Sequence, residues 1–454
     1  MAGSRNLGGA RARVVRATGG AVSRQGARDW LLAAADQGLI SLSNFLAGIY
    51  LARMLDPTQF GVYAVGFLLL HGIGAVQEGI ILQPMSTLGA MLAGPRFGRY
   101  LSATAVLQLL EAAASALAVA IGGWILTRLG NDTAGPTLFG LWFVFLVWQP
   151  QEYLRRLFYP ARRIQDAVVN TAVASTLRLA VLVWYGSRGS LSGMAGMHAI
   201  AWGALAAIPL GLWQARRHWQ RRALDLRGAW QENWRFGRWV LGGQLAAWVS
   251  LEVYPILAAG LVNFAAAGAY RAVQTLVAPV HVVIAALDPF LTPRASRAEA
   301  HLGRLALRRT LRRAFIFLVA PVLGYLLLVT LAAPALLQLL FGDKYLGYAP
   351  MVTLFALQYG LWFTYFPFQV GLKALRRTRP IFIAHGLAIL AMFSLGIVLI
   401  RAFGVYGATL GQVLNALIAL TVIGLAWRQA SREEEMPSGI EAIEPLSGEH
   451  VPGP

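Results

Sequence analysis

The chain has 454 residues, of which 57% are hydrophobic and 13% charged, and its mean hydropathy is +0.57. Soluble domains carry about a quarter charged residues, so this composition indicates a membrane protein with several spans and not a soluble domain. The absence of cysteine excludes disulfides, zinc–thiolate clusters and thiol nucleophiles.

The two ends of the chain differ in charge. Residues 1–29 hold six arginines among Gly, Ala and Ser, and no apolar core with a small-residue cleavage site precedes the first span. We therefore expect a basic cytoplasmic tail and not a signal peptide. Residues 429–454 are acidic and contain Pro and Gly, which predicts a disordered cytoplasmic tail.

Between these tails, apolar runs recur that are long enough to cross a bilayer as helices of about 20 residues. We expect an all-α polytopic membrane protein with about twelve spans, at residues 30–53, 61–83, 100–127, 136–158, 167–185, 191–213, 239–261, 268–291, 314–333, 349–371, 381–402 and 407–427.

Basic residues alternate between the predicted connections in step with these spans. With both termini cytoplasmic, roughly 32 of the 39 Lys and Arg residues lie on the inner side. The formal charge of +19 is therefore read as a topology signal and as contact with anionic lipids, and no nucleic-acid partner is expected. Residues 214–238 mix Trp with Arg, which predicts an amphipathic cytoplasmic linker at the membrane interface.

The chain resembles itself at an offset of half its length. A shift of 207 residues superposes Gly61 on Gly268, and a shift of 214 superposes Arg162 on Arg376. This predicts two six-helix lobes with the same orientation, a substrate cavity between them, and bends that let the lobes rock. The lobes are residues 30–213 and 239–428.

One predicted span carries a stripe of polar side chains. Arg271, Gln274, His281 and Asp288 fall within roughly a 100° arc of one helical face. Ionisable groups at membrane depth are costly unless they face a cavity or one another, so the stripe indicates a passage or a binding site.

Polar stripes on other spans fit the same cavity. Those chosen as substrate-binding candidates are Gln37, Asn44, Trp148, Gln151, Arg155, Arg178, Trp362 and Tyr365. Interhelical hydrogen bonding is an equally good reading for any single Gln or Asn. The acids Asp36, Glu78, Glu252 and Asp288 are candidates for ion coupling, although Glu252 could instead neutralise Arg271 across a hairpin. No metal-ligand cluster or cofactor motif is present, and neither a metal nor a cofactor is expected.

Four segments carry a resemblance to a known family. NFLAGIYLARMLDPTQFGVYAV, GAYRAVQTLVAPV, LLFGDKYLGYAP and FGVYGATLGQVLNALI resemble bacterial polysaccharide flippases of the Wzx type, in the superfamily that also holds the MATE exporters. The similarity covers residues 30–430. It implies two lobes forming a V around a cationic cavity, in the bacterial inner membrane, and alternating access for an undecaprenyl-pyrophosphate-linked oligosaccharide.

We weigh three functions. The first is a flippase for a polyprenyl-pyrophosphate-linked glycan in surface polysaccharide synthesis, monomeric and working beside a polysaccharide polymerase and chain-length machinery. The second is a cation-coupled exporter of drugs or small molecules, which would use the acids named above. The third, a membrane glycosyltransferase or polymerase, is disfavoured because the outer connections are short and no paired-carboxylate loop appears. We expect no enzymatic activity.

Overall fold

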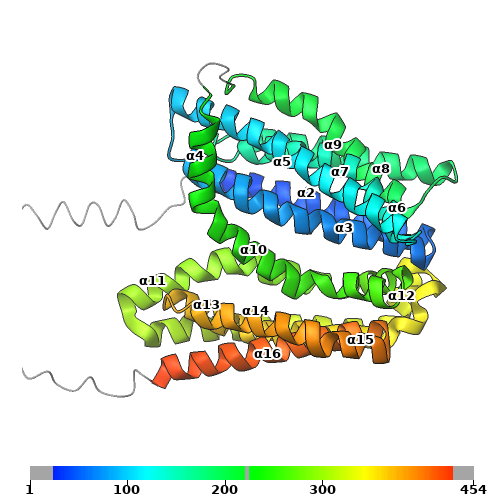
Figure 1. Ribbon diagram of the computed structural model, residues 1–454. Coiled ribbons are helices and arrows are strands. Elements are labelled where there is room, and N and C mark those ends of the chain that lie inside the picture. The colour runs from blue at the N-terminus through cyan, green and yellow to red at the C-terminus, as the bar shows by residue number, and fades with distance from the viewer. Residues whose placement is uncertain (1–23, 220–223, 433–454) are drawn as a thin grey trace, which may run out of the picture. The chain divides into compact units, whose positions relative to one another are not determined.

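The computed structural model describes residues 24–219 and 224–432 (Figure 1). Most of the predicted basic tail and of the predicted acidic tail lies outside these residues. Every regular element within the described ranges is a helix, which confirms the predicted all-α class.

The first half of the chain contributes most of the helices of one bundle. They are α2 (Arg24–Met54), α3 (Pro57–Gln77), η1 (Glu78–Leu82), α4 (Gln83–Gly89), α5 (Gly94–Arg128), α6 (Ala134–Gly140), α7 (Trp142–Leu157), α8 (Ile164–Ser187) and α9 (Gly193–Ala215). The η1 segment is a π-helical turn that carries α3 into α4 without a break.

The second half follows with α10 (Leu226–Leu261), α11 (Phe264–Leu331), α12 (Ala333–Phe341), η2 (Asp343–Tyr348), α13 (Ala349–Ala374), α14 (Arg379–Ala391), η3 (Met392–Gly396), α15 (Ile397–Phe403) and α16 (Val405–Arg432). The segment α11 consists of two helices joined at a kink, where Gly303 has a φ of 75°. All twelve predicted spans therefore fall on helices.

Eight helical stretches in the described chain are long and apolar enough to cross a membrane, which makes this a multi-pass membrane protein. The four predicted spans without such a stretch are α2, α7, the start of α11 and α13. These are helices in which the polar stripes were predicted. α7 has only 16 residues, and polar side chains on one face lower the hydropathy of a helix, as on the start of α11.

The turn from α2 to α3 is set by the sequence Asp56-Pro57. The Asp56 carboxylate accepts hydrogen bonds from the backbone N–H groups of Thr58 (2.9 Å) and Gln59 (3.1 Å). Pro57 occupies the first helical turn, where its missing N–H costs nothing. The LDPTQFG motif is therefore a helix start.

The backbone preserves the internal repeat. Eight described residues have a positive φ, and they pair at separations of 209 to 215 residues: Gly94 with Gly303, Gly130 with Gly342, Arg162 with Arg376, and Gly189 with Gly404. Around the Arg pair even the hydrogen bonds match. Arg163 N donates to Phe158 O and Arg377 N to Leu372 O, both at 2.8 Å, as in a Schellman helix end. The repeat predicted from the sequence is thus present in the turns.

By compactness the chain forms two units. Among the described residues, the first comprises those up to Thr275 with Pro334–Ala349 and Ile400–Ala408, and the second comprises Leu276–Ala333, Pro350–Leu399 and those from Thr409 on. In Figure 1, α2, α3, α5, α7, α8 and α9 run alongside one another in the first unit. The lobe boundaries expected from the sequence, 30–213 and 239–428, remain a prediction.

Two glycines related by the repeat cross within the first unit. A Cβ on Gly61 of α3 would lie 1.7 Å from the carbonyl oxygen of Phe264. A Cβ on Gly268 of α11 would lie 2.4 Å from the carbonyl oxygen of Pro57. The two backbones approach closely because neither residue has a side chain.

A second contact in this unit joins η2 to the end of α2. The amine of Lys344 donates to the carbonyl oxygens of Arg53 and Leu55, both at 2.8 Å. Tyr345 beside it is fully buried against Phe60 and Phe341. The LLFGDKYLGYAP motif is therefore a structural cap on a helix end.

Candidate functional site

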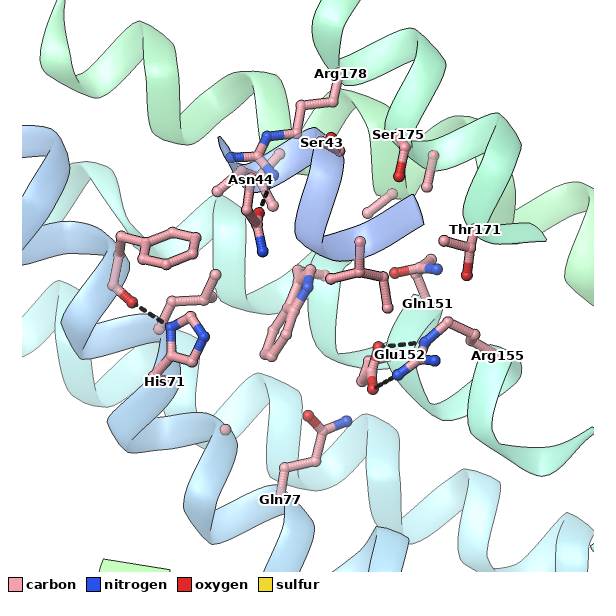
Figure 2. Close-up of a pocket in the computed structure, with 18 of the residues that line it drawn as sticks. Ser43, Asn44, His71, Gln77, Gln151, Glu152, Arg155, Thr171, Ser175 and Arg178 are labelled. Atoms are coloured by element: carbon pink, nitrogen blue, oxygen red, sulfur yellow. Dashed lines mark hydrogen bonds and ion pairs between the residues drawn. The ribbon is translucent and has the colours of Figure 1, made fainter. Parts of the chain in front are cut away.

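A cavity of about 290 Å³ lies inside the first unit, among α2, α3, η1, α7, α8 and α9 (Figure 2). It gathers seven of the residues predicted from the polar stripes: Gln37, Asn44, Glu78, Trp148, Gln151, Arg155 and Arg178. One face of each helix supplies these residues, whereas the cavity expected between the two lobes stays a prediction.

The polar lining also includes four residues that lie on the predicted stripes, His71, Glu152, Thr171 and Ser175, and two that the sequence did not indicate, Ser43 and Gln77. Gln77 directly precedes Glu78 in a largely apolar helix. A polar residue beside a charged one in such a helix could have indicated Gln77 as a lining residue. His71 is held in place by its Nδ1 atom, 2.8 Å from the Phe67 carbonyl oxygen.

One end of the cavity is a charge cluster around Arg155, which is 7% exposed. Its guanidinium is paired with Asp36, which is fully buried, and with Glu152 on the preceding turn of α7. Asp36 also accepts hydrogen bonds from Thr171 and from Tyr159 (2.6 Å). Arg155 was predicted as a cation for substrate, but two carboxylates already neutralise it.

The cluster extends to the neighbouring arginine. Arg156 lies 2.8 Å from Glu78 and 3.5 Å from Glu152. Three carboxylates thus share two guanidinium groups. Tyr159, which follows α7, is a neutral donor to this cluster, because burial and then the hydrogen bond to Asp36 raise the pKa of its phenol.

Arg178 occupies the other end of the cavity, as Figure 2 shows. It is 7% exposed and donates to Asn44 Oδ1 and to the hydroxyl of Tyr63 (2.9 Å). Both partners are neutral, and its Nε atom and the hydroxyl of Ser43 have no hydrogen-bond partner in the described part of the chain. Arg178 is therefore a buried cation with donor capacity left for an anion.

Arg271 and Gln274 lie near this cavity, on the part of α11 that belongs to the first unit. Arg271 donates to Gln274 Oε1 (2.8 Å), and its guanidinium stands 5.6 Å from the ring centre of Phe67, a lining residue. No described carboxylate lies within ion-pair distance of Arg271. Glu252, the predicted partner of Arg271, forms no ion pair with it.

The remaining predicted residues lie in the second unit. Asp288 is paired with Lys373 at 2.8 Å. The ring of His281 packs on Trp362, with 5.2 Å between centroids, and Tyr365 is buried at 8% exposure. The stripe on α11 is thus divided, since Arg271 and Gln274 belong to one unit and His281 and Asp288 to the other. Nowhere in the described ranges do three His, Asp or Glu side chains group as metal ligands.

The chain is similar to known proteins in sequence and in fold. The family model described as polysaccharide biosynthesis protein matches residues 97–350. A structure of an inward-facing multidrug resistance MATE family transporter of the MOP superfamily is 14% identical, with a TM-score of 0.72 over 88% of this chain and 96% of that chain.

The lipid II flippase MurJ, in an inward closed conformation, is 11% identical, with a TM-score of 0.65 over 88% of this chain and 87% of that chain. A MOP superfamily transporter from Pyrococcus furiosus is described as having a binding pocket of reverse polarity. It is 14% identical, with a TM-score of 0.61 over 90% of this chain and 95% of that chain. At these identities the likeness shows the fold. No curated protein sequence matches the chain.

Proposed function

The chain belongs to the polysaccharide biosynthesis protein family and has the fold of MOP superfamily transporters, and from this premise we propose that it flips a lipid-linked glycan across the membrane. The substrate is an oligosaccharide carried on undecaprenyl pyrophosphate, moved from the inner to the outer leaflet by alternating access. The arginine distribution supports an inner membrane protein with both termini cytoplasmic.

The observation that carries this proposal is the uncompensated cation in the cavity. A diphosphate that leaves water needs fixed positive charge, and the planar guanidinium of Arg suits phosphate oxygens. Arg178 offers such a group, with its neighbour Ser43 able to donate as well. Arg271, beside the lining residue Phe67, is a second cation without a carboxylate partner in the described chain.

The size of the cavity limits what it holds. At about 290 Å³ it lies at the lower end of the range for ligand pockets, so it takes one phosphate group or one sugar ring and not a whole oligosaccharide. The prenyl tail remains in lipid while the headgroup crosses, so the tail needs no room in the cavity. Trp148 provides an aromatic face in the lining on which a sugar can stack.

Three of the four acids predicted for ion coupling also favour the flippase over the exporter. Asp36, Glu78 and Asp288 are each paired with a basic side chain. A carboxylate that is already neutralised by a guanidinium or an ammonium group attracts a transported cation less than a free one does. A cation-coupled exporter remains the second candidate, because three carboxylates share only two guanidiniums around Glu152 and one negative charge is left over.

A deletion strain separates the two functions. Loss of surface polysaccharide with unchanged resistance to dyes and drugs is the expected result, and the wild-type gene should restore the polysaccharide. Loss of drug resistance with normal polysaccharide would reject the flippase. Accumulation of the lipid-linked oligosaccharide in the inner leaflet identifies the blocked step and places the protein before the polymerase, its expected partner.

A further inference from the structure

Glu111 on α5 is a carboxylate at membrane depth that the charge cluster does not include. None of the ion pairs among the described residues involves it. It accepts three hydrogen bonds instead, from Gln149 Nε2 (2.9 Å), Gln108 Nε2 (3.1 Å) and Ser115 Oγ (3.1 Å). Every group that contacts the carboxylate is therefore a neutral donor.

A chain of buried amides joins this carboxylate to the cavity. Gln77 lines the cavity and points toward it in Figure 2. Its Nε2 atom donates to Gln108 Oε1 (3.0 Å) and to the backbone oxygen of Gln149 (2.8 Å). Gln77, Gln108 and Gln149 are at most 1% exposed. The side-chain oxygens of Gln77 and Gln149 have no hydrogen-bond partner in the described part of the chain.

We propose that Glu111 is a proton-binding site, held by the side-chain amides of Gln108 and Gln149 and linked through Gln108 to Gln77 in the cavity lining. An ionised carboxylate without a cationic partner is unfavourable at membrane depth, and protonation removes that penalty. The proton attaches to a carboxylate oxygen and no other covalent bond changes.

The amides allow both states to be hydrogen-bonded. The ionised carboxylate accepts from three donors, as observed. A protonated carboxyl must donate to an oxygen, and rotation of the Gln149 amide by half a turn presents its unpartnered oxygen to Glu111. Reversal of one amide therefore accompanies binding of the proton. The packing of α5 against α3 and α7 then depends on whether Glu111 is protonated.

Other titratable groups on the packed helices are already engaged. Tyr153 on α7 donates its hydroxyl to the Leu101 carbonyl oxygen at 2.7 Å. His71 on α3 faces the cavity and is bonded to the Phe67 backbone. Neither is hydrogen-bonded to Glu111, and the acids Glu78 of η1 and Glu152 of α7 are paired with Arg156 and Arg155. The inference does not depend on which molecule is transported.

Infrared difference spectroscopy tests this on the full protein in lipid nanodiscs during a pH titration. We expect a carboxylic acid C=O band that appears on acidification, is absent in Glu111→Gln and is retained in Glu232→Gln, which removes an exposed carboxylate of α10. Ser115→Ala should move the midpoint of the band to higher pH, because it removes a donor to the ionised form.

Three results would overturn the proposal. The band could persist unchanged in Glu111→Gln, or the midpoint could stay the same in Ser115→Ala. Alternatively, the band could respond to Na⁺ at constant pH, which would make Glu111 part of a metal cation site. Should Glu111→Gln fail to elute as a single folded species, the Ser115→Ala comparison, which alters one hydroxyl, decides alone.

Discussion

Arg155 and Arg178 line the same cavity with the same exposure of 7%, yet their charges are used differently. Arg155 is bound between Asp36 and Glu152, whereas Arg178 is bound by the neutral groups of Asn44 and Tyr63. Removal of the first arginine leaves buried negative charge, and removal of the second takes away the positive charge available to a ligand. Two substitutions of the same kind should therefore produce different defects.

Arg178→Ala should abolish surface polysaccharide while the protein still inserts at wild-type levels, because Arg155, the other arginine of the described cavity lining, is already neutralised by carboxylates. Arg178→Lys should restore transport only in part, since an ammonium group cannot engage phosphate with two parallel donors. Arg271→Ala should behave in the same way. Quantitative staining of surface glycan, normalised to protein in the membrane, is the measurement. Normal glycan in Arg178→Ala would remove this residue from the site.

Arg155→Gln should mainly destabilise the protein. An unpaired buried carboxylate costs roughly 3–5 kcal/mol, so the thermal midpoint in detergent should fall. The double variant Asp36→Asn/Arg155→Gln should recover a large part of the loss, because it removes the stranded charge as well. A double variant no more stable than the single one would show that the pair is not coupled.

The two residues also show where prediction from the sequence stops. Both were predicted to face a cavity, because polar side chains in an apolar helix need a polar neighbour, and both do. The pairing of Arg155 with Asp36 spans 119 residues. Which of several acids pairs with Arg155 depends on how α2 and α7 pack against each other. The periodicity of neither helix encodes that packing.

At the scale of helices, close backbone contacts and buried amides hold the bundle together. The start of α11 crosses α3 at Gly268 and Gly61. The beginning of α10 docks through Asn233, which is fully buried, accepts from the Tyr100 hydroxyl (2.6 Å) and donates to the Ile80 carbonyl oxygen (3.1 Å). Ile80 lies in the π-helical turn η1. Part of the predicted amphipathic linker is thus a helix packed on the first bundle.

Gly61→Ala should be strongly destabilising, by more than 3 kcal/mol, because its Cβ would overlap a backbone oxygen that cannot rotate away. Gly260→Ala is the matched control, since nothing lies within 4 Å of a Cβ placed there. The thermal midpoints of the two variants in detergent give the comparison. Equal midpoints would contradict the observed crossing.

Asn233→Leu should loosen the start of α10 and leave the rest of the bundle folded. It removes one donor and one acceptor from a buried site and leaves the Tyr100 hydroxyl without its partner, at a cost of about 1–3 kcal/mol. Hydrogen exchange should accelerate at residues 226–240. Gln231→Ala, at an exposed position of the same helix, should show wild-type exchange. Wild-type protection in Asn233→Leu would mean that docking depends on other contacts.

At the scale of the whole chain, the internal repeat is the main regularity. Only a few identities mark it in the sequence, because its core positions accept any apolar residue of suitable size. The repeat is clearer in the turns. The equivalent residues Arg162 and Arg376 both have a positive φ, which is uncommon for residues other than glycine. The positions of the helices could be predicted from the apolar runs of the sequence, whereas the cavity inside the first unit could not, since it arises where six helical segments meet.

The inside–outside arrangement of the chain can be tested directly because the sequence holds no cysteine. Asp132→Cys, between α5 and α6, should react with a membrane-impermeant maleimide in intact cells. Arg217→Cys, after α9, should react only after the membrane is opened. Both positions are exposed, so a difference in labelling reports sidedness. The reverse pattern would invert the proposed topology.

The chain contains only two lysines, and both side-chain amines are engaged. Lys344 holds the end of α2 through two carbonyl oxygens, and Lys373 holds the Asp288 carboxylate. An amine engaged in this way resists acylation until its contact opens. Competitive labelling with an acylating reagent, followed by mass spectrometry, can therefore report how often each contact breaks during turnover in the unmodified protein.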